Sequence, residues 1–464
     1  MVMYQGCGQS TQALVVGSGM AGLLAARVLA DHFTRVVIVE QDEITSDTDY
    51  RRSVPQARHP HGMLKRGADI FERLFPGLQA ELVSEGAPII DFGKDPFYLF
   101  PTGLAPRAAT GIHVQMVTRG TLERHVRRRV LALPQVTLRS GWHVDDLVWN
   151  EQSAQLIGVR ITPTKPLCDA ASPSECVEAR LVICSTGRTS TISDWLERAG
   201  YGTPRSLRVN GRMSYSSRLI KPSASVGGCV RADAQLTFAP WTRRGGTAIT
   251  VEGGQQLLTL LGADGELPPN NSEAFYSYAQ SLQHPGIHAA LTEAATLGPI
   301  YRMINCNNTW TLFHRMSYWP ERLIVMGDAY CTFNPVYGQG MTVAAIEADL
   351  LDKLLRKRKS DDLSGLARNF HRRAARAIRV PWMLTTSTDL RWTPEQQNLT
   401  TRLIHWYTDQ LLRAIPGRPH VYRRFLQATQ LTRSPAVLLH PRVISAVAGV
   451  LARKCLGTQT EEGA

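Results

Sequence analysis

Two glycine-rich stretches at opposite ends of the chain carry the residue types that hold a nucleotide cofactor. Near the start, GSGMAG places Gly17, Gly19 and Gly22 in GxGxxG spacing between an apolar run (13–16) and an apolar helical segment (23–29). These glycines allow a tight turn and a close approach of a pyrophosphate to the backbone. A second apolar run ends at Glu40, whose carboxylate would accept a ribose hydroxyl. The stretch predicts a complete βαβ dinucleotide fold, with Met20 and Ala21 in the ligand-facing turn.

The second stretch, LIVMGDAYCTFNPVYGQGMTVAAIEAD, spans residues 323–349. Its apolar start predicts a buried strand that ends at Gly327-Asp328, and the segment after the turn predicts a helix from Met341. A helix start offers unpaired N–H groups and the positive end of a dipole, which suit an anionic group or an electron-rich ring edge. The glycines of the turn would let a flat ligand lie against the backbone. On these grounds Asp328, Gly338 and Gly340 are predicted to face this ligand.

The two motifs together resemble the FAD-dependent aromatic hydroxylases and epoxidases, the para-hydroxybenzoate-hydroxylase-like flavoproteins. In that family the first motif holds the ADP half of FAD, and the loop of the second motif faces the isoalloxazine ring. The resemblance implies that Asp328 contacts the ribityl–pyrophosphate region. It also implies that Pro335 and residues 338–341 lie at the flavin edge. The resemblance covers most of residues 10–350.

Two further arginines are implicated in FAD binding. The segment RRSVPQARHPHGML (51–64) resembles a loop of one subgroup, which includes the epoxidases that act on linear polyenes in polyether biosynthesis. This likeness implies that Arg52 contacts a FAD phosphate, with a solvated surface arginine as the alternative. Relatives also place an arginine against FAD at a strand-to-helix junction, which Arg119 matches. An arginine at a helix start opposes the helix dipole, which indicates an anionic partner.

The source of electrons stays open at this stage. The segment TGRTSTISDW follows a predicted buried strand (181–185) and aligns with a family motif that binds the FAD pyrophosphate and the reducing nicotinamide. Here Thr186 replaces the aspartate of that motif, and Ser193 stands where many relatives have arginine. Direct NAD(P)H use and a separate flavin reductase are therefore both retained as electron sources.

We expect an α/β fold in which a Rossmann-like FAD-binding domain is interleaved with an antiparallel-sheet substrate domain, followed by a helical C-terminal region. The FAD-binding domain is assigned to residues 1–88, 111–202 and 311–350. The substrate domain is assigned to two strands at 89–110 and to a sheet at 203–310, where apolar and polar residues alternate. Residues 351–464 form the basic helical region.

Composition narrows the classes of function. The eight cysteines contain no CxxC pair, which argues against a zinc site or a redox dithiol. No apolar run reaches the roughly 18 residues needed to span a bilayer. We therefore expect a cytoplasmic protein. Of the net charge of +13, residues 351–464 contribute +12, from 20 Lys and Arg against 8 Asp and Glu.

This basic region has two interpretations. One is a solvated face of a helical bundle, and the other is a membrane-surface patch that would make the protein peripheral to the membrane. Nucleic acid is not expected as a partner, since the sequence has no zinc-finger spacing and no RNA-binding aromatic motif.

The resemblance implies an FAD-dependent monooxygenase that uses O2. Reduced flavin would form a C4a-hydroperoxide and pass one oxygen atom to a hydrophobic polyketide or isoprenoid, most directly as an alkene epoxidation. Aromatic hydroxylation by the same mechanism is the first alternative, and a reductase or dehydrogenase of the geranylgeranyl-reductase type is the second. A halogenase is disfavoured because the chain has no WxWxIP segment. The flavin carries the chemistry, so no catalytic side chain is assigned. A protein that binds FAD without turnover remains as a non-enzymatic reading.

Overall fold

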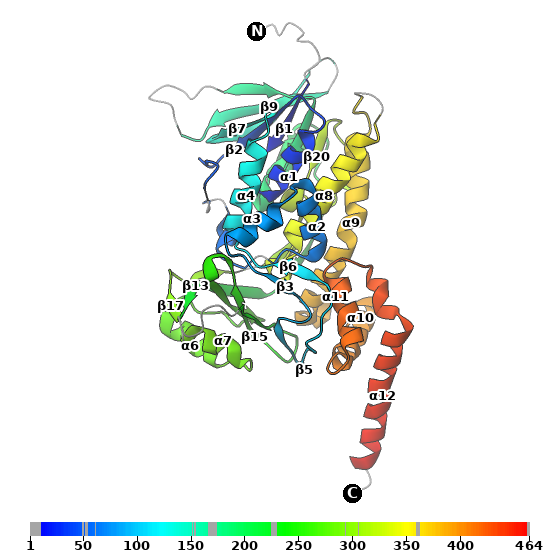
Figure 1. Ribbon diagram of the computed structural model, residues 1–464. Coiled ribbons are helices and arrows are strands. Elements are labelled where there is room, and N and C mark those ends of the chain that lie inside the picture. The colour runs from blue at the N-terminus through cyan, green and yellow to red at the C-terminus, as the bar shows by residue number, and fades with distance from the viewer. Residues whose placement is uncertain are drawn as a thin grey trace.

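The computed structural model describes residues 11–461, except for 49–50, 52–53, 61, 151, 153–154, 166–173, 224–229, 293, 305 and 359–361. Figure 1 shows a parallel sheet with its helices at one end, a larger sheet with two short helices at the other, and C-terminal helices beside both. The fold class predicted from the sequence is confirmed. The arrangement brings residues from both ends of the chain into the same part of the molecule.

A five-stranded parallel sheet forms the core of the Rossmann-like domain. Four of its strands are largely buried and rich in Val, Ile and Leu, as expected for a sheet covered on both faces, whereas the edge strand at residues 136–140 is only partly buried. They come from four separate parts of the chain, and all four pairings are parallel. In spatial order the strands are β20 (Leu323–Val325), β11 (Leu181–Cys184), β1 (Gln12–Val16), β2 (Arg35–Glu40) and β7 (Val136–Ser140).

Helices and a small sheet cover this core. Helix α8 begins within the second glycine-rich stretch and packs against α1, α2 and α9, which links the two ends of the chain. The helices are α1 (Met20–Leu29), α2 (Lys65–Leu74), α3 (Leu78–Ser84), α4 (Arg119–Leu131), α5 (Ile192–Arg198), α8 (Gln339–Arg356) and α9 (Leu366–Asp389). The covering sheet consists of β8 (Trp142–Trp149), β9 (Leu156–Pro163) and β10 (Glu175–Glu178).

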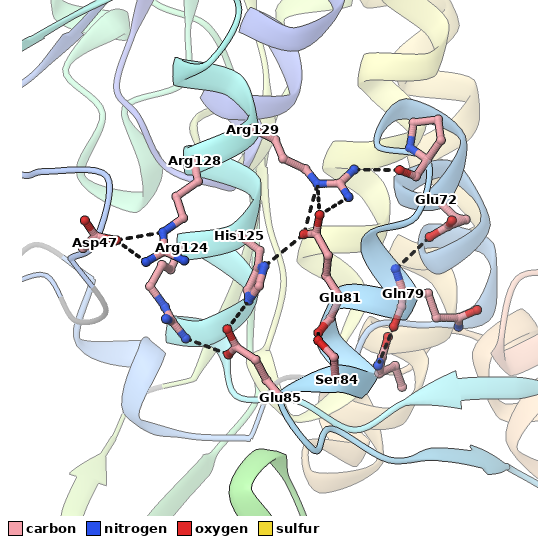
Figure 2. Close-up of polar contacts among 12 residues, drawn as sticks. Asp47, Glu72, Gln79, Glu81, Ser84, Glu85, Arg124, His125, Arg128 and Arg129 are labelled. Atoms are coloured by element: carbon pink, nitrogen blue, oxygen red, sulfur yellow. Dashed lines mark hydrogen bonds and ion pairs between the residues drawn. The ribbon is translucent and has the colours of Figure 1, made fainter.

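Helix α4 has two basic faces with different partners. On its outer face, arginines and a histidine form ion pairs with carboxylates of α3 and of the loop after β2 (Figure 2). His125 lies between Glu81 and Glu85, with N···O distances of 3.1 and 2.9 Å, and Arg124 pairs with Glu85 at 2.9 Å. Arg128 pairs with Asp47. The outer arginines are thereby paired with carboxylates locally, and the inner face of α4 is turned toward the site described below.

The second large sheet is mostly antiparallel. Its strand order is β17 (Ala294–Thr296), β13 (Met213–Pro222), β16 (Gln256–Ala263), β15 (Arg244–Thr250), β14 (Ala232–Gln235), β4 (Phe97–Phe100) and β5 (Gly103–Leu104), and β18 (Tyr301–Met303) also pairs with β13. Helices α6 (Ser272–Gln280) and α7 (Pro285–Thr292) pack on one face. A short ladder joins β3 (Ile89–Asp91) to β6 (His113–Gln115). In a three-stranded sheet, β19 (Asn307–Thr311) lies between β12 (Ser206–Asn210) and β21 (Cys331–Thr332).

The C-terminal helices share a hydrophobic core with the second sheet. Side chains of α10 (Leu399–Ala414) and α11 (Pro419–Thr429), among them Leu411 and Tyr422, pack around Phe100 of β4. Helix α12 (Pro441–Glu461) packs on α10 and then extends away from the body (Figure 1). Because of this shared core, the basic region is part of the fold that surrounds the second sheet. Within the described residues, no helix combines the length and hydropathy needed to cross a membrane.

Candidate functional site

A cavity of about 380 Å³ opens at the carboxyl ends of the parallel strands, the position where open α/β sheets bind ligands. Both glycine-rich motifs and the segment after β11 contribute to its wall. Arg52 lies outside the described residues, and Gly22 packs behind the wall. The other predicted site residues line the cavity, namely Gly17, Gly19, Met20, Ala21, Glu40, Arg119, Asp328, Pro335, Gly338, Gly340 and Met341.

Three glycines leave room that any other residue would fill. Gly17 has a φ of +92°, and a Cβ there would lie 2.8 Å from the carbonyl oxygen of Ser185. A Cβ at Gly22 would lie 1.9 Å from the carbonyl oxygen of Gly17, so this glycine allows α1 to pack on the turn. Gly338 has a φ of +64°, and its Cβ would lie 2.6 Å from the carbonyl oxygen of Gly62. The backbone conformation of both glycine-rich stretches therefore requires residues without a side chain at these positions.

Glu40 lies at the end of β2, as predicted, and is buried. Its Oε2 accepts hydrogen bonds from the backbone N–H and the hydroxyl of Ser18, at 2.8 and 2.7 Å. The Nη1 of Arg51 lies 3.0 Å from the same oxygen, and the N–H of Asp42 donates to Oε1 at 2.9 Å. The carboxylate is thus fixed at the cavity wall by groups that the GxGxxG pattern alone does not identify.

The inner face of α4 carries a buried charge cluster. Glu123 pairs with Arg51, Arg119 and Arg127, each at 2.9 Å. Burial raises the pKa of Glu123, but the three guanidinium groups outweigh it and hold that pKa below the ordinary value. The anionic partner expected for Arg119 at the helix start is therefore, within the protein itself, Glu123.

The charge cluster fits the pyrophosphate of FAD. Three arginines face only two carboxylates, Glu40 and Glu123, so one positive charge is left over. Among the described residues, the buried Nε of Arg51 has no hydrogen-bond partner. The Nη2 of Arg51 lies 3.7 Å from the position of a Cβ on Gly19, which places this guanidinium beside the glycine turn. An anionic ligand here would find both a net positive charge and a free donor.

Asp328 faces the cavity next to an arginine that the sequence analysis did not assign. The Nε of Arg188 lies 3.6 Å from Oδ2 of Asp328, and its Nη2 donates to the carbonyl oxygen of Phe333 at 2.8 Å. Burial raises the pKa of Asp328, against the opposing effect of Arg188 and Arg119. Arg188 lies in the TGRTST segment. The sequence signal for Arg188 is a cationic residue within a segment that aligns with a nucleotide-binding motif.

A second cavity, of about 440 Å³, shares three lining residues with the first: Gly62, Pro335 and Gly338. Its wall is mostly apolar and is formed by residues 60 and 62–64, the strands β4 and β14–β16, and the helices α9–α11. Its charged side chains are paired, Arg391 with Asp409 at 2.7 Å and Asp233 with Arg231 at 3.3 Å. The sequence analysis assigns the sheet in this wall to the substrate domain, and the structure adds a wall of C-terminal helices. Side chains such as Leu411, Tyr422 and Phe425 were not expected there.

Two residues with reactive side chains are inert in this structure. His59 is buried, its Nδ1 lies 2.8 Å from the Ser217 hydroxyl, and burial, followed by the nearby Arg58, lowers its pKa to about 4. The imidazole is therefore neutral at pH 7. Cys331 is also buried, and burial raises the pKa of its thiol well above the ordinary value, so it is not a thiolate nucleophile.

No group of His, Cys, Asp and Glu in the described parts of the chain is arranged to hold a metal.

Comparisons with known sequences agree with the N-terminal part of this description. A family model described as an NAD(P)-binding Rossmann-like domain matches residues 15–74. Protein Rv3254 of Mycobacterium tuberculosis (strain ATCC 25618 / H37Rv) is 29% identical over 384 residues, which cover 82% of this chain and 80% of that protein.

Solved structures extend the likeness to nearly the whole chain. A flavoprotein/dehydrogenase from Cytophaga hutchinsonii gives a TM-score of 0.66 at 15% identity, covering 96% of this chain and 100% of that one. HpxO from Klebsiella pneumoniae, a single-residue variant complexed with FAD, gives 0.62 at 16% identity, covering 91% and 99%. PqsL from Pseudomonas aeruginosa, a probable FAD-dependent monooxygenase, gives 0.59 at 16% identity, covering 82% and 97%. At the level of the fold, the resemblance to the para-hydroxybenzoate-hydroxylase-like flavoproteins is confirmed.

Proposed function

We propose that this protein is an FAD-dependent monooxygenase that inserts one oxygen atom of O2 into a neutral, hydrophobic molecule of polyketide or isoprenoid type, most directly by epoxidation of an alkene. The observation that carries the proposal is the position of the apolar cavity. This apolar cavity is the second cavity described above, and the first is called the cofactor cavity from here on. The two adjoin at Pro335 and Gly338, the residues assigned to the flavin edge. A hydrophobic substrate there would lie against the reactive end of the cofactor.

Bound FAD would supply the chemistry, since the reduced cofactor activates O2 without help from a nucleophilic side chain. The chain contributes binding and exclusion of water. The arginines around Glu123 would hold the pyrophosphate, and Glu40 would orient the ribose. The apolar lining of the second cavity would keep the reacting region dry. The neutral His59 and the protonated Cys331 agree with a site that does not use side-chain nucleophiles.

Aromatic hydroxylation by the same cofactor remains the first alternative, because an apolar cavity of this size admits a ring as well as a chain. A reductase of the geranylgeranyl-reductase type remains the second. One structural neighbour is described as a dehydrogenase and another as a probable monooxygenase, so the fold does not choose between these chemistries.

The residue at position 186 bears on which reductant supplies electrons to the flavin. Thr186, at the position of the family's aspartate, lines the cofactor cavity, and its hydroxyl donates to Ser190 at 2.6 Å. No acid is present at this position to assist a nicotinamide. We propose that a separate flavin reductase supplies the electrons, with direct use of NAD(P)H as the alternative.

The test uses isotopic oxygen. The purified protein, loaded with FAD and supplied with NADPH and a flavin reductase, is incubated under ¹⁸O2 with a linear polyene or with a lipophilic phenol. One ¹⁸O atom in an epoxide supports the proposal, and one in a hydroxylated ring moves it to the first alternative. Saturation or desaturation of a substrate without ¹⁸O, under anaerobic conditions, would move it to the reductase.

We also propose that the C-terminal region contacts an anionic lipid surface, from which a hydrophobic substrate would enter. On α9, the exposed Arg368, Arg372, Arg376 and Arg379 share one helical face with Met383, which is 38% exposed and lines the apolar cavity. On α10, three apolar side chains with i, i+4, i+7 spacing face solvent, Leu399 at 83%, Leu403 at 64% and Trp406 at 48% exposed. Basic and apolar surfaces next to a cavity suit a negatively charged membrane surface.

Vesicle sedimentation tests this contact. We expect the protein to sediment with phosphatidylglycerol-containing vesicles and far less with pure phosphatidylcholine. The triple change Leu399→Ser, Leu403→Ser and Trp406→Ser should abolish sedimentation without altering FAD binding. Absence of binding to the anionic vesicles, or a concentration-dependent dimer in place of it, would contradict the proposal.

A further inference from the structure

Asp389, the last residue of α9, reaches from the C-terminal helices into the loop of the second motif. Its carboxylate is fully buried. It accepts hydrogen bonds from the side-chain amides of Asn308 at 2.6 Å and Asn334 at 3.1 Å, and from the phenol of Tyr337 at 2.7 Å. Asn334 and Tyr337 belong to the loop between the two cavities, and Asn308 lies on β19. One carboxylate therefore ties together three segments of the chain.

Backbone contacts fix the direction of both amides. The Oδ1 of Asn308 accepts from the N–H of Asn334 at 2.8 Å, and the Oδ1 of Asn334 accepts from the N–H of Val336 at 3.2 Å. Both NH₂ groups must then point to Asp389, because each amide has only one oxygen. A side chain at position 389 must accept from two amides and a phenol at once. A carboxylate meets this requirement, whereas an amide would place its own NH₂ among these donors.

A glycine on a neighbouring segment leaves space for this arrangement. A Cβ on Gly211 would lie 2.6 Å from the Nδ2 of Asn334 and 2.9 Å from Oδ2 of Asp389. No cation pairs with Asp389 among the residues that the structure describes. Burial raises the pKa of Asp389 to about 6, in opposition to its three donors. A buried carboxylate without a counter-ion is costly, so its retention calls for a role that a neutral residue would not fill.

The loop held by Asp389 is the part of the site where cofactor and substrate would meet. Pro335 and Gly338 line both cavities, and Tyr337 lines the apolar one. A shift of this loop would change the shape of both cavities at their junction. Within the part of the chain that the structure describes, the side chains of Asn334 and Tyr337 join this loop to α9 through their hydrogen bonds to Asp389.

We propose that Asp389 is the positioning residue of the cofactor-facing loop, holding residues 334–338 against FAD and making the C-terminal region part of the catalytic unit. The inference rests on the proposed FAD site, but it concerns how the loop is placed and not which reaction follows. The inference requires that one carboxylate faces the hydrogen-bond donors of this cluster. The carboxylate can stand at position 389 or, after an exchange of side chains, at position 334.

An exchange of side chains tests this claim. Asp389→Asn should raise the dissociation constant for FAD roughly ten- to a hundredfold and shift the visible spectrum of the bound flavin, because two amides would then oppose each other. The double variant Asn334→Asp with Asp389→Asn restores one carboxylate among amides. We expect it to return the dissociation constant to within about fivefold of wild type. Thr386→Val, which removes a buried hydroxyl that bonds only within α9, is the matched control and should leave FAD binding unchanged.

The measurements are FAD titration of the apoprotein by flavin fluorescence, the flavin absorption spectrum, and thermal unfolding of the apoprotein. Wild-type affinity and spectrum in Asp389→Asn would overturn the inference, even if its melting temperature falls. Failure of the exchange variant to recover FAD binding, although it unfolds at the temperature of the control, would also overturn it. If wild-type protein does not bind FAD, the proposed function fails together with the inference. If wild-type protein binds FAD and Asp389→Asn binds it equally well, the inference fails and the proposed function stands.

Discussion

The guanidinium of Arg51 lies 3.0 Å from the carboxylate of Glu40, the acid that ends the βαβ motif. Both side chains are buried, and the same guanidinium pairs with Glu123 on α4 at 2.9 Å. The loop after β2 is therefore joined to the dinucleotide motif and to α4 through one side chain. This places a cation beside the glycine turn, where the pyrophosphate of FAD would lie.

The first prediction concerns this cation. Arg51→Met should weaken FAD binding roughly ten- to a hundredfold, because it removes a charged donor worth about 1.5–3 kcal/mol and leaves Glu123 with one fewer partner. Titration of the apoprotein with FAD measures the change. Arg128→Met, on the outer face of α4 (Figure 2), removes the same charge from a surface ion pair and should leave the affinity near wild type. Equal losses in both variants would indicate a general charge effect and not a phosphate contact.

A second prediction concerns Asp328. Asp328→Ala should weaken FAD retention by roughly 1.5–3 kcal/mol, because it removes a charged acceptor at the cavity wall and leaves Arg188 without its partner. Asp328→Asn keeps an acceptor oxygen and should retain more affinity than the alanine variant. Equilibrium dialysis against free FAD gives both values. Unchanged affinity in the alanine variant would contradict the placement of the second motif at the ribityl chain.

Glu347 gives a third prediction, on stability. It is fully buried on α8, its Oε2 accepts from the N–H of Gly327 at 2.7 Å, and burial raises its pKa to about 8. Between about pH 4.5 and 8 the folded protein keeps a proton on this group that the unfolded chain releases. Folding stability from this group is therefore present at low pH and is lost as the pH rises toward 8.

Glu347→Gln stays neutral at every pH and keeps the acceptor for Gly327. We expect the melting temperature of this variant, relative to wild type, to rise steadily from pH 5 to pH 8. Glu347→Ala should be less stable than the glutamine variant by about 1–3 kcal/mol throughout, because it leaves the Gly327 N–H unsatisfied. Thermal unfolding of the apoproteins across this range checks both. A constant difference between the glutamine variant and wild type would show that Glu347 is ionised in the folded protein.

The fold was predictable because its signals are local. Buried strands such as β1 and β20 are short apolar runs bounded by glycine, and the helix α8 begins at Gln339, close to the predicted Met341. The glycines at 17, 22 and 338 carry a steric requirement that is visible in the sequence as spacing. The role of such residues can be predicted from neighbours a few positions away in the sequence.

The missed residues depend on contacts distant in sequence. Arg51, in the loop after β2, pairs with Glu123 of α4. Asp389 contacts Asn308 across 81 positions. Leu411 lines a cavity together with strands that come some 150 or more residues earlier in the chain. A helical pattern shows that the C-terminal region has an apolar face, but not what the face covers. The sequence analysis therefore interprets this region by its helical pattern and its charge, and it does not predict a contribution to the apolar cavity.

The last prediction tests the assignment of the apolar cavity as the substrate site. Ala234 on β14 lines it, opposite Tyr98 of β4 in the sheet register. Ala234→Phe adds a ring inside the cavity without touching the residues that line the cofactor cavity. We expect kcat/KM for a long polyene to fall roughly five- to 150-fold, since a ring in the substrate's place costs about 1–3 kcal/mol of binding, with FAD affinity unchanged.

The control adds the same ring outside the cavity. Ala295 on β17 is exposed, so Ala295→Phe should leave both turnover and FAD binding at wild-type values. A short alkene that fits beside the new ring at position 234 should lose less activity than the long polyene, because the blockage is one of volume. If Ala234→Phe instead weakens FAD binding, or affects short and long substrates equally, the ring acts through the fold. The substrate would then have to enter from another face of the cofactor cavity.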